Sequence, residues 1–143
     1  MAEKIPDGDF TSHVAFQSLP RLFVEQSLKS NPSGNVLGLE QNAHDGIFIQ
    51  ASASVRTVEL EKWARPKVQA MVEAIRDFAS PIEGGLFPFV YLNYAHPSQE
   101  VLRSYGPENV RRMKEAAAKY DPAGVLQRLC PGGFKISALN ESE

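Results

Sequence analysis

Residues 47–56, Ile-Phe-Ile-Gln-Ala-Ser-Ala-Ser-Val-Arg, decide the fold, because two sets of side chains alternate along them. Such alternation is typical of a strand that packs one face on a core. The opposite face carries Phe48 and the polar residues Gln50, Ser52 and Ser54, which we expect to face water or a polar cavity. Because a short strand is expected at residues 35–40 and Asp45-Gly46 follows it, the sequence predicts a hairpin.

A long helix is predicted directly after this strand. Thr57 is a suitable N-cap residue, and Glu59 and Glu61 lie near the positive N-terminal end of the helix. Apolar residues then recur at spacings of three and four as far as Phe78, so one face of the helix is expected to be buried. Pro66 lies well inside this pattern and predicts a kink or a break.

The remaining elements complete an α+β order. A strand is expected at residues 13–18, followed by a helix with Pro20 near its first turn, and another strand at 87–94. The order strand, helix, strand, strand, helix, strand matches a ferredoxin-like split βαββαβ sheet with helices on one face. Further helices are predicted from residue 107 to 120 and from 122 to 129, and we expect two copies to pair as a dimer.

Composition and charge exclude several classes of protein. The chain has 143 residues, 43% of them hydrophobic and 22% charged, which describes one folded domain, expected at 12–137 between flexible tails at 1–11 and 138–143. The net charge of −2 argues against a nucleic-acid partner. A single cysteine, Cys130, provides neither a disulfide nor a zinc cluster and favours a reducing compartment. Without a signal peptide or a membrane-length apolar run, we expect a soluble cytoplasmic protein with no membrane partner.

Polar and aromatic groups concentrate between residues 91 and 105, whereas phosphate loops, dinucleotide fingerprints, paired-histidine metal motifs and nucleophile elbows are absent. Tyr91 and Tyr94 should point to opposite faces of the expected strand, so that at most one lines a given cavity. His96 is either a turn residue or a proton-transfer group, and Asn93 either completes a turn or orients a ligand. Arg103 either binds an acidic substrate or lies on a solvated face. No metal ligands are proposed.

Separated blocks of this sequence resemble the C-terminal region of fungal FAD-linked oxidases of the vanillyl-alcohol-oxidase and berberine-bridge-enzyme superfamily. The match spans about residues 17–137, and the blocks that carry it are residues 34–39, 91–99, 104–110, 119–127 and 131–135. The resemblance implies that an N-terminal domain, which this sequence lacks, holds FAD. It also implies that the family's Asn-Tyr pair near the flavin is Asn93-Tyr94, while His96 replaces the usual acidic residue two positions later.

Three functions follow from these patterns. The leading one is a stand-alone, flavin-free enzyme of fungal secondary metabolism that directs cyclisation or isomerisation of an apolar intermediate by shape and proton transfer. His96 would act as acid or base, Tyr91 or Tyr94 would donate to a developing oxyanion, and Asn93 would orient the substrate. A cavity beside the sheet would be lined by Gln50, Ser52, Ser54 and Tyr91. The alternatives are a fragment or subunit of an FAD-dependent oxidoreductase and a non-catalytic metabolite-binding module.

Overall fold

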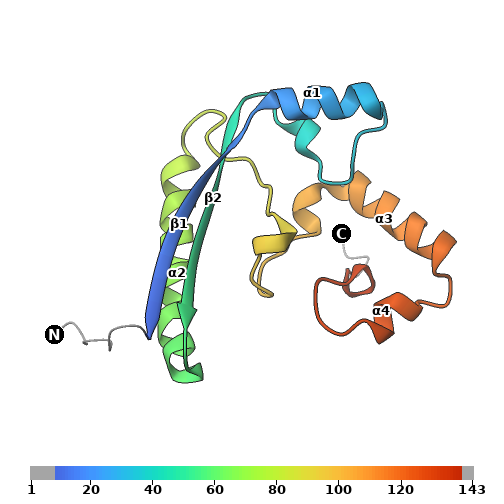
Figure 1. The fold of residues 1–143 in the computed structure, drawn as a ribbon. Helices are drawn as coiled ribbons and strands as arrows, with labels where there is room; N and C mark the ends of the chain where they lie inside the picture. Colours follow the sequence, from blue (N-terminus) through green and yellow to red (C-terminus); the bar gives the residue numbers. More distant parts are fainter. Residues whose placement is uncertain (1–8, 140–143) are drawn as a thin grey trace. The chain divides into compact units, whose positions relative to one another are not determined.

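The computed structural model describes residues 9–139, and these divide into two compact units (Figure 1). Of the described residues, the first unit contains 9–20 together with His44–Phe87, and the second contains Arg21–Ala43 together with 88–139. Each unit is therefore built from two separate stretches of sequence. Among the described residues, the structure has a two-stranded antiparallel sheet and four α-helices, which confirms a mixed α and β fold.

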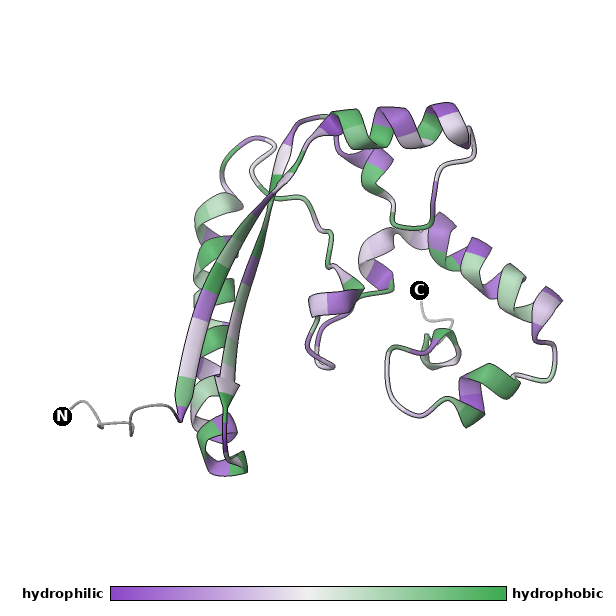
Figure 2. Ribbon diagram, viewed as in Figure 1, coloured by the Kyte–Doolittle hydropathy of each residue, from purple (hydrophilic) through white to green (hydrophobic). Residues whose placement is uncertain are grey.

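The first unit is a two-stranded antiparallel sheet covered by one helix. Strand β1 (Phe10–Leu19) pairs antiparallel with strand β2 (Gly46–Val55), from Phe10 opposite Val55 to Leu19 opposite Gly46. Hydrophobic and hydrophilic residues follow one another along both strands (Figure 2). Helix α2 (Val58–Ala79) packs against β2, and the ring of Trp63 meets the ring of Phe10 edge to face at 5.7 Å between centroids. The strand predicted from the alternation at 47–56 is thus confirmed.

The predicted start of α2 is also confirmed, because Thr57 Oγ1 accepts a hydrogen bond of 3.2 Å from the Leu60 backbone N–H. The break predicted at Pro66 is not found, since α2 runs without interruption from Val58 to Ala79. Proline removes only one hydrogen bond from a helix, and α2 is held against β2 by packing.

Two predicted strands are wrong, and the four-stranded ferredoxin-like sheet is accordingly not formed by the described residues. Residues 35–40 form a turn in which Asn35 Oδ1 accepts from the Leu37 N–H, and Gly38 adopts a left-handed conformation with φ of 72°. β2 therefore pairs with β1 instead of with this segment. In residues 87–94, Pro88 lacks an N–H and the Val90 N–H donates to Ser104 Oγ at 3.1 Å, so no ladder forms.

The second unit is helical. Its α-helices are α1 (Arg21–Ser30), α3 (Pro107–Tyr120) and α4 (Val125–Leu129), and short 3-10 helices cover Leu39–Gln41, Leu92–Tyr94, Arg103–Tyr105 and Ile136–Ala138. The helix predicted to begin at residue 107 with proline in its first turn is confirmed. Val101, Leu102 and Tyr105 form the buried centre of this unit, and partly buried hydrophobic residues from Leu37 to Leu139 pack around them.

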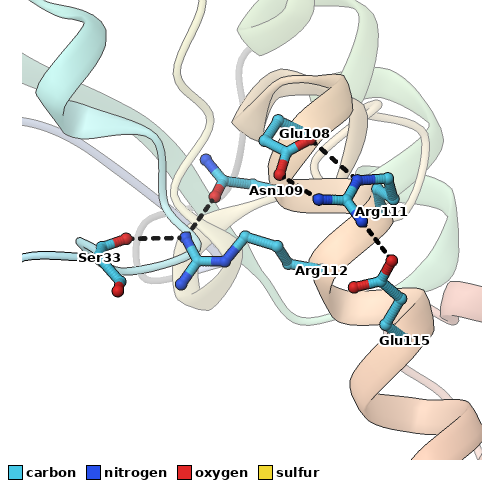
Figure 3. A network of polar contacts seen from close by, with 6 residues as sticks. All are labelled: Ser33, Glu108, Asn109, Arg111, Arg112 and Glu115. Atoms are coloured by element: carbon cyan, nitrogen blue, oxygen red, sulfur yellow. Dashed lines mark hydrogen bonds and ion pairs between the residues drawn. The ribbon is translucent and has the colours of Figure 1, made fainter.

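Polar side chains of α3 hydrogen-bond to the loop that follows α1 (Figure 3). The Arg112 guanidinium donates to the Ser33 carbonyl and to Asn109 Oδ1, both at 3.1 Å. On the exposed side of the same helix, Arg111 pairs with Glu108 and Glu115. These contacts hold the loop after α1 against α3, and Asn109 of α3 also hydrogen-bonds the Tyr105 carbonyl.

No helix in the described part of the chain is both long enough and apolar enough to cross a membrane.

Candidate functional site

The polar segment at 91–105 is anchored by the buried centre of the second unit. Ser104, near the end of this segment, links it to the residue just before its start. Its hydroxyl donates to the Val101 carbonyl at 2.6 Å and accepts from the Val90 N–H at 3.1 Å. Because Val101, Leu102 and Tyr105 are buried while Asn93, Tyr94 and His96 are exposed, the segment presents its polar groups outward from a fixed base.

Aromatic rings connect that base to the exposed turn. The Phe89 ring stacks on the Tyr105 ring at 5.8 Å and on the Tyr91 ring at 6.3 Å, both between centroids. The Tyr91 ring then meets the Tyr94 ring edge to face at 5.2 Å. Contacts of this kind add to the stability that burial itself provides. The four rings form a continuous row from the buried Tyr105 to Tyr94, which is 52% exposed.

The prediction that Tyr91 and Tyr94 point in opposite directions is wrong. It assumed a strand, but Leu92–Tyr94 is a 3-10 helix with Tyr91 as its N-cap residue. Side chains three residues apart lie above one another in a 3-10 helix, so the two tyrosines come together on one side. Asn93 joins them, because its Nδ2 donates to the Tyr91 hydroxyl oxygen at 2.9 Å.

His96 lies in the following turn, where its ring is held by neighbours. Its Nδ1 accepts from the Ser98 backbone N–H at 3.2 Å and lies 2.8 Å from the Ser98 hydroxyl, while its own backbone N–H donates to Gln99 Oε1 at 2.8 Å. A backbone N–H is always the donor, so Nδ1 carries the lone pair. In its neutral form the His96 ring therefore has its proton on Nε2.

The other predicted site residues are not part of the turn formed by Tyr91, Asn93, Tyr94 and His96. Arg103 Nε is 3.3 Å from Glu100 Oε2, in an exposed ion pair. Gln50, Ser52 and Ser54 lie on β2 in the first unit, where Ser52 Oγ is 2.8 Å from Nε2 of His13 on the neighbouring strand. These three residues share one face of the two-stranded sheet, as their alternation predicted. They belong to a different unit from Tyr91.

Tyr105 was not singled out as a functional residue by sequence reasoning. Its side chain is 3% exposed, and its hydroxyl lies near the Leu92 backbone amide without completing a hydrogen bond of normal geometry. Burial raises the pKa of Tyr105 because the phenolate loses water, and the nearby Tyr91 adds to this, whereas the Leu92 backbone amide opposes it. The available signal was the spacing of Val101, Leu102 and Tyr105, which places three apolar groups on one face of a helical turn.

The described residues do not fit a complete FAD. The polar segment is exposed, so it could contact one side of a ligand but does not enclose one. Helix α3 begins with Pro107, which has no N–H, and Glu108, whose carboxylate repels phosphate, so its N-terminus is unsuited to a pyrophosphate. Nor do any three His, Cys, Asp or Glu side chains within residues 9–139 gather into a possible metal site.

Comparisons with known proteins identify a group of relatives. The chain is 33% identical over 139 residues to the FAD-dependent monooxygenase drtC of Aspergillus calidoustus, covering 97% of this chain and 26% of that protein. It is 34% identical over 128 residues to the FAD-dependent monooxygenase sdcF of Emericella nidulans, covering 90% and 26%. For the FAD-dependent monooxygenase FUP4 of Fusarium proliferatum, the identity is 36% over 115 residues, covering 76% and 21%.

The chain therefore spans about a quarter of the length of the curated relatives it matches. Its homologues are fungal FAD-dependent monooxygenases, and the matched sequence is a partial region of them. This bears out the FAD-linked part of the resemblance seen in the sequence, while the particular superfamily stays a prediction. Neither a protein-family profile nor a solved structure matches the chain.

Proposed function

We propose that this chain forms one wall of the substrate site of an FAD-dependent oxidoreductase and works together with a flavin-binding part of that enzyme. The observation that carries the proposal is the exposed turn of Tyr91, Asn93 and Tyr94, held on a buried aromatic base, in a chain similar over 97% of its length to a quarter of a monooxygenase.

The exposure of this turn supports a site that is completed by additional protein. Tyr94 is half-exposed and Asn93 and His96 are also open to solvent, so water would compete for each hydrogen bond to a substrate. Catalytic hydrogen bonds strengthen when a site excludes water. The fixed base, by contrast, is what a binding wall requires, because its groups must keep their positions when a ligand arrives.

Each residue of the turn has a definite task in this proposal. The phenol and amide groups of Tyr94 and Asn93 hydrogen-bond and orient the substrate, and the Tyr91 hydroxyl, which accepts from Asn93, holds that amide in place. The neutral His96 ring carries its N–H on Nε2 and can donate a hydrogen bond from it to a substrate oxygen. The flavin, held by the other part of the enzyme, would supply the oxidation chemistry when bound.

A chimera tests this function. In it, this chain replaces the matched segment of drtC, and bound flavin and turnover of the substrate of drtC are measured in the chimera and in the unmodified relative. We expect the chimera to bind flavin and retain turnover, and the isolated chain to do neither. A chimera that binds flavin as well as the relative but has no turnover would contradict the proposal.

The second candidate is a flavin-free cyclase or isomerase formed by the chain alone, which requires no cofactor and acts as a homodimer on a polyene, quinone or phenolic intermediate. The N–H on Nε2 of His96 favours it, because this group can hydrogen-bond a developing oxyanion on the intermediate. Turnover of such intermediates by the purified chain, lost in both His96→Ala and Tyr94→Phe, would support this candidate. A monomeric and inactive chain would exclude it.

A further inference from the structure

The two paired strands of the first unit carry no permanently charged side chain. Neither β1 nor β2 contains Asp, Glu, Lys or Arg over their ten residues each. Soluble proteins commonly protect an edge strand with a charged residue or a proline, because its unpaired backbone groups otherwise accept another strand. β1 has no such protection, and it is exposed along nearly its whole length, whereas β2 is largely half-buried.

One face of this two-stranded sheet is largely apolar and only partly covered by α2. By the register, Val14, Phe16, Ile47 and Ile49 lie on the same face as Phe10, whose ring contacts Trp63 of α2. The helix therefore covers the Phe10 end of this face. Phe16 is 70% exposed and Ile47 is 67% exposed, while Val14 and Ile49 are each a little over a third exposed. Neighbouring exposed apolar side chains on one face of a sheet mark an interaction surface.

We propose that β1 and this apolar face are the docking surface for the flavin-binding part of the enzyme, which adds a β-strand along the free edge of β1. The inference rests on the proposed function. The match covers 26% of drtC, so about three quarters of that protein lies outside it. The proposed occupant is the polypeptide that corresponds to this remaining part. The added strand supplies backbone hydrogen bonds along β1 and apolar side chains over Phe16 and Ile47.

The occupant is not chosen by exposure alone. In the relatives, the sequence equivalent to these two strands is followed or preceded by a much longer polypeptide. Nearly all of this chain is matched in drtC, so the two strands lie within the matched portion. A surface without charges suits permanent burial against a large apolar partner, because no ion has to be desolvated there. A second copy of this chain is the competing occupant, and the experiment distinguishes it.

The test compares two substitutions in two settings. Phe16→Lys places a charge on the apolar face, and Gln17→Lys places the same charge on the opposite face, at the next position of β1. Each is made in the isolated full chain and in the chimera with drtC, and thermal melting is measured. We expect Phe16→Lys to lower the melting temperature of the chimera by several degrees and to leave the isolated chain unchanged, with Gln17→Lys neutral in both.

Equal effects of Phe16→Lys and Gln17→Lys in the chimera would overturn the inference, as would an equal effect of Phe16→Lys in the chimera and the isolated chain. Failure of the chimera to fold, while drtC folds under the same conditions, would also overturn it. An isolated chain that forms a stable dimer, dissociated by Phe16→Lys, would assign the surface to a second copy. These outcomes concern stability only, so they are independent of whether Asn93 and Tyr94 affect turnover.

Discussion

The carbonyl oxygen of Tyr105 accepts a hydrogen bond of 3.0 Å from Nδ2 of Asn109, a side chain that is only 3% exposed. Asn109 Oδ1 in turn accepts from Arg112, which reaches the Ser33 carbonyl. One buried amide thus joins the 3-10 turn under the aromatic row to helix α3 and to the loop after α1. The position of the exposed site depends on this contact.

Asn109→Ala should therefore destabilise the protein by about 1 to 3 kcal/mol, because the substitution removes a buried hydrogen bond and leaves the Tyr105 carbonyl without it. Urea unfolding measures the change. Gln69→Ala is a suitable control, since Gln69 is exposed and contacts only Glu73 on its own helix in the hydrogen bonds described. Similar stabilities of the two variants would show that the Asn109 contact contributes little.

Gly38 is a position at which the structure leaves no room for a methyl group. Its φ is 72°, and a Cβ there would lie 2.5 Å from the Tyr105 carbonyl oxygen. Gly132 has a similar φ of 75° but no atom within 4 Å of such a Cβ. Both Gly→Ala substitutions incur the left-handed strain of about 1 kcal/mol, and Gly38→Ala should lose clearly more in thermal unfolding. Equal losses would mean that the backbone near Tyr105 yields to the methyl group.

Tyr105→Phe should leave stability unchanged or raise it by up to about 1 kcal/mol, because it removes a buried hydroxyl whose contact with the Leu92 backbone amide is not a hydrogen bond of normal geometry, and it keeps the ring stacked on Phe89. Chemical denaturation of the variant and of Tyr94→Phe provides the comparison. A loss of stability in Tyr105→Phe alone would indicate that the hydroxyl has a partner, such as a bound water.

Glu108 links stability to pH. Its hydrogen bond to Arg111 lowers the pKa of this carboxyl below its ordinary value of 4.5, helped by the charges of Arg111 and Arg112. A lowered folded-state pKa gives stability that is present above 4.5 and is lost as the pH falls through the folded value.

Glu108→Gln should consequently flatten the acid limb of a stability profile measured by thermal melting. Because both partners act through the same contact, Arg111→Ala should flatten it to a similar extent, and the double variant should add little more. The magnitude is small for groups this exposed. Additive effects of the two substitutions would contradict the assignment.

Local sequence signals predicted the elements that depend on neighbouring residues. The alternation at 47–56, the N-cap at Thr57 and the proline at the start of α3 each follow from chemistry within a few positions. The conformations of the two segments wrongly predicted as strands do not follow from neighbouring residues alone. Residues 35–40 and 87–94 have strand-like apolar runs, but contacts of Gly38 with Tyr105 and of Val90 with Ser104, distant in sequence, decide their conformation.

The candidate site was likewise only partly predictable from neighbouring residues. Its concentration of polar and aromatic residues was visible in the sequence, whereas the joint orientation of Tyr91 and Tyr94 depends on a 3-10 turn that replaces the expected strand. The pairing of β2 with β1, across the whole of α1, likewise could not be inferred from periodicity, because alternation gives the faces of a strand and not its partner.

Steady-state kinetics of site variants in the chimera with drtC test the central claim most directly. Asn93→Ala and Tyr94→Phe should each lower kcat/KM by about tenfold or more, as the loss of a hydrogen bond made to the reacting substrate does, with bound flavin unchanged. Tyr120→Phe, an exposed tyrosine on α3, should be neutral. If Asn93→Ala and Tyr94→Phe keep the kcat/KM of the unsubstituted chimera, the turn does not line the substrate site and the account is wrong.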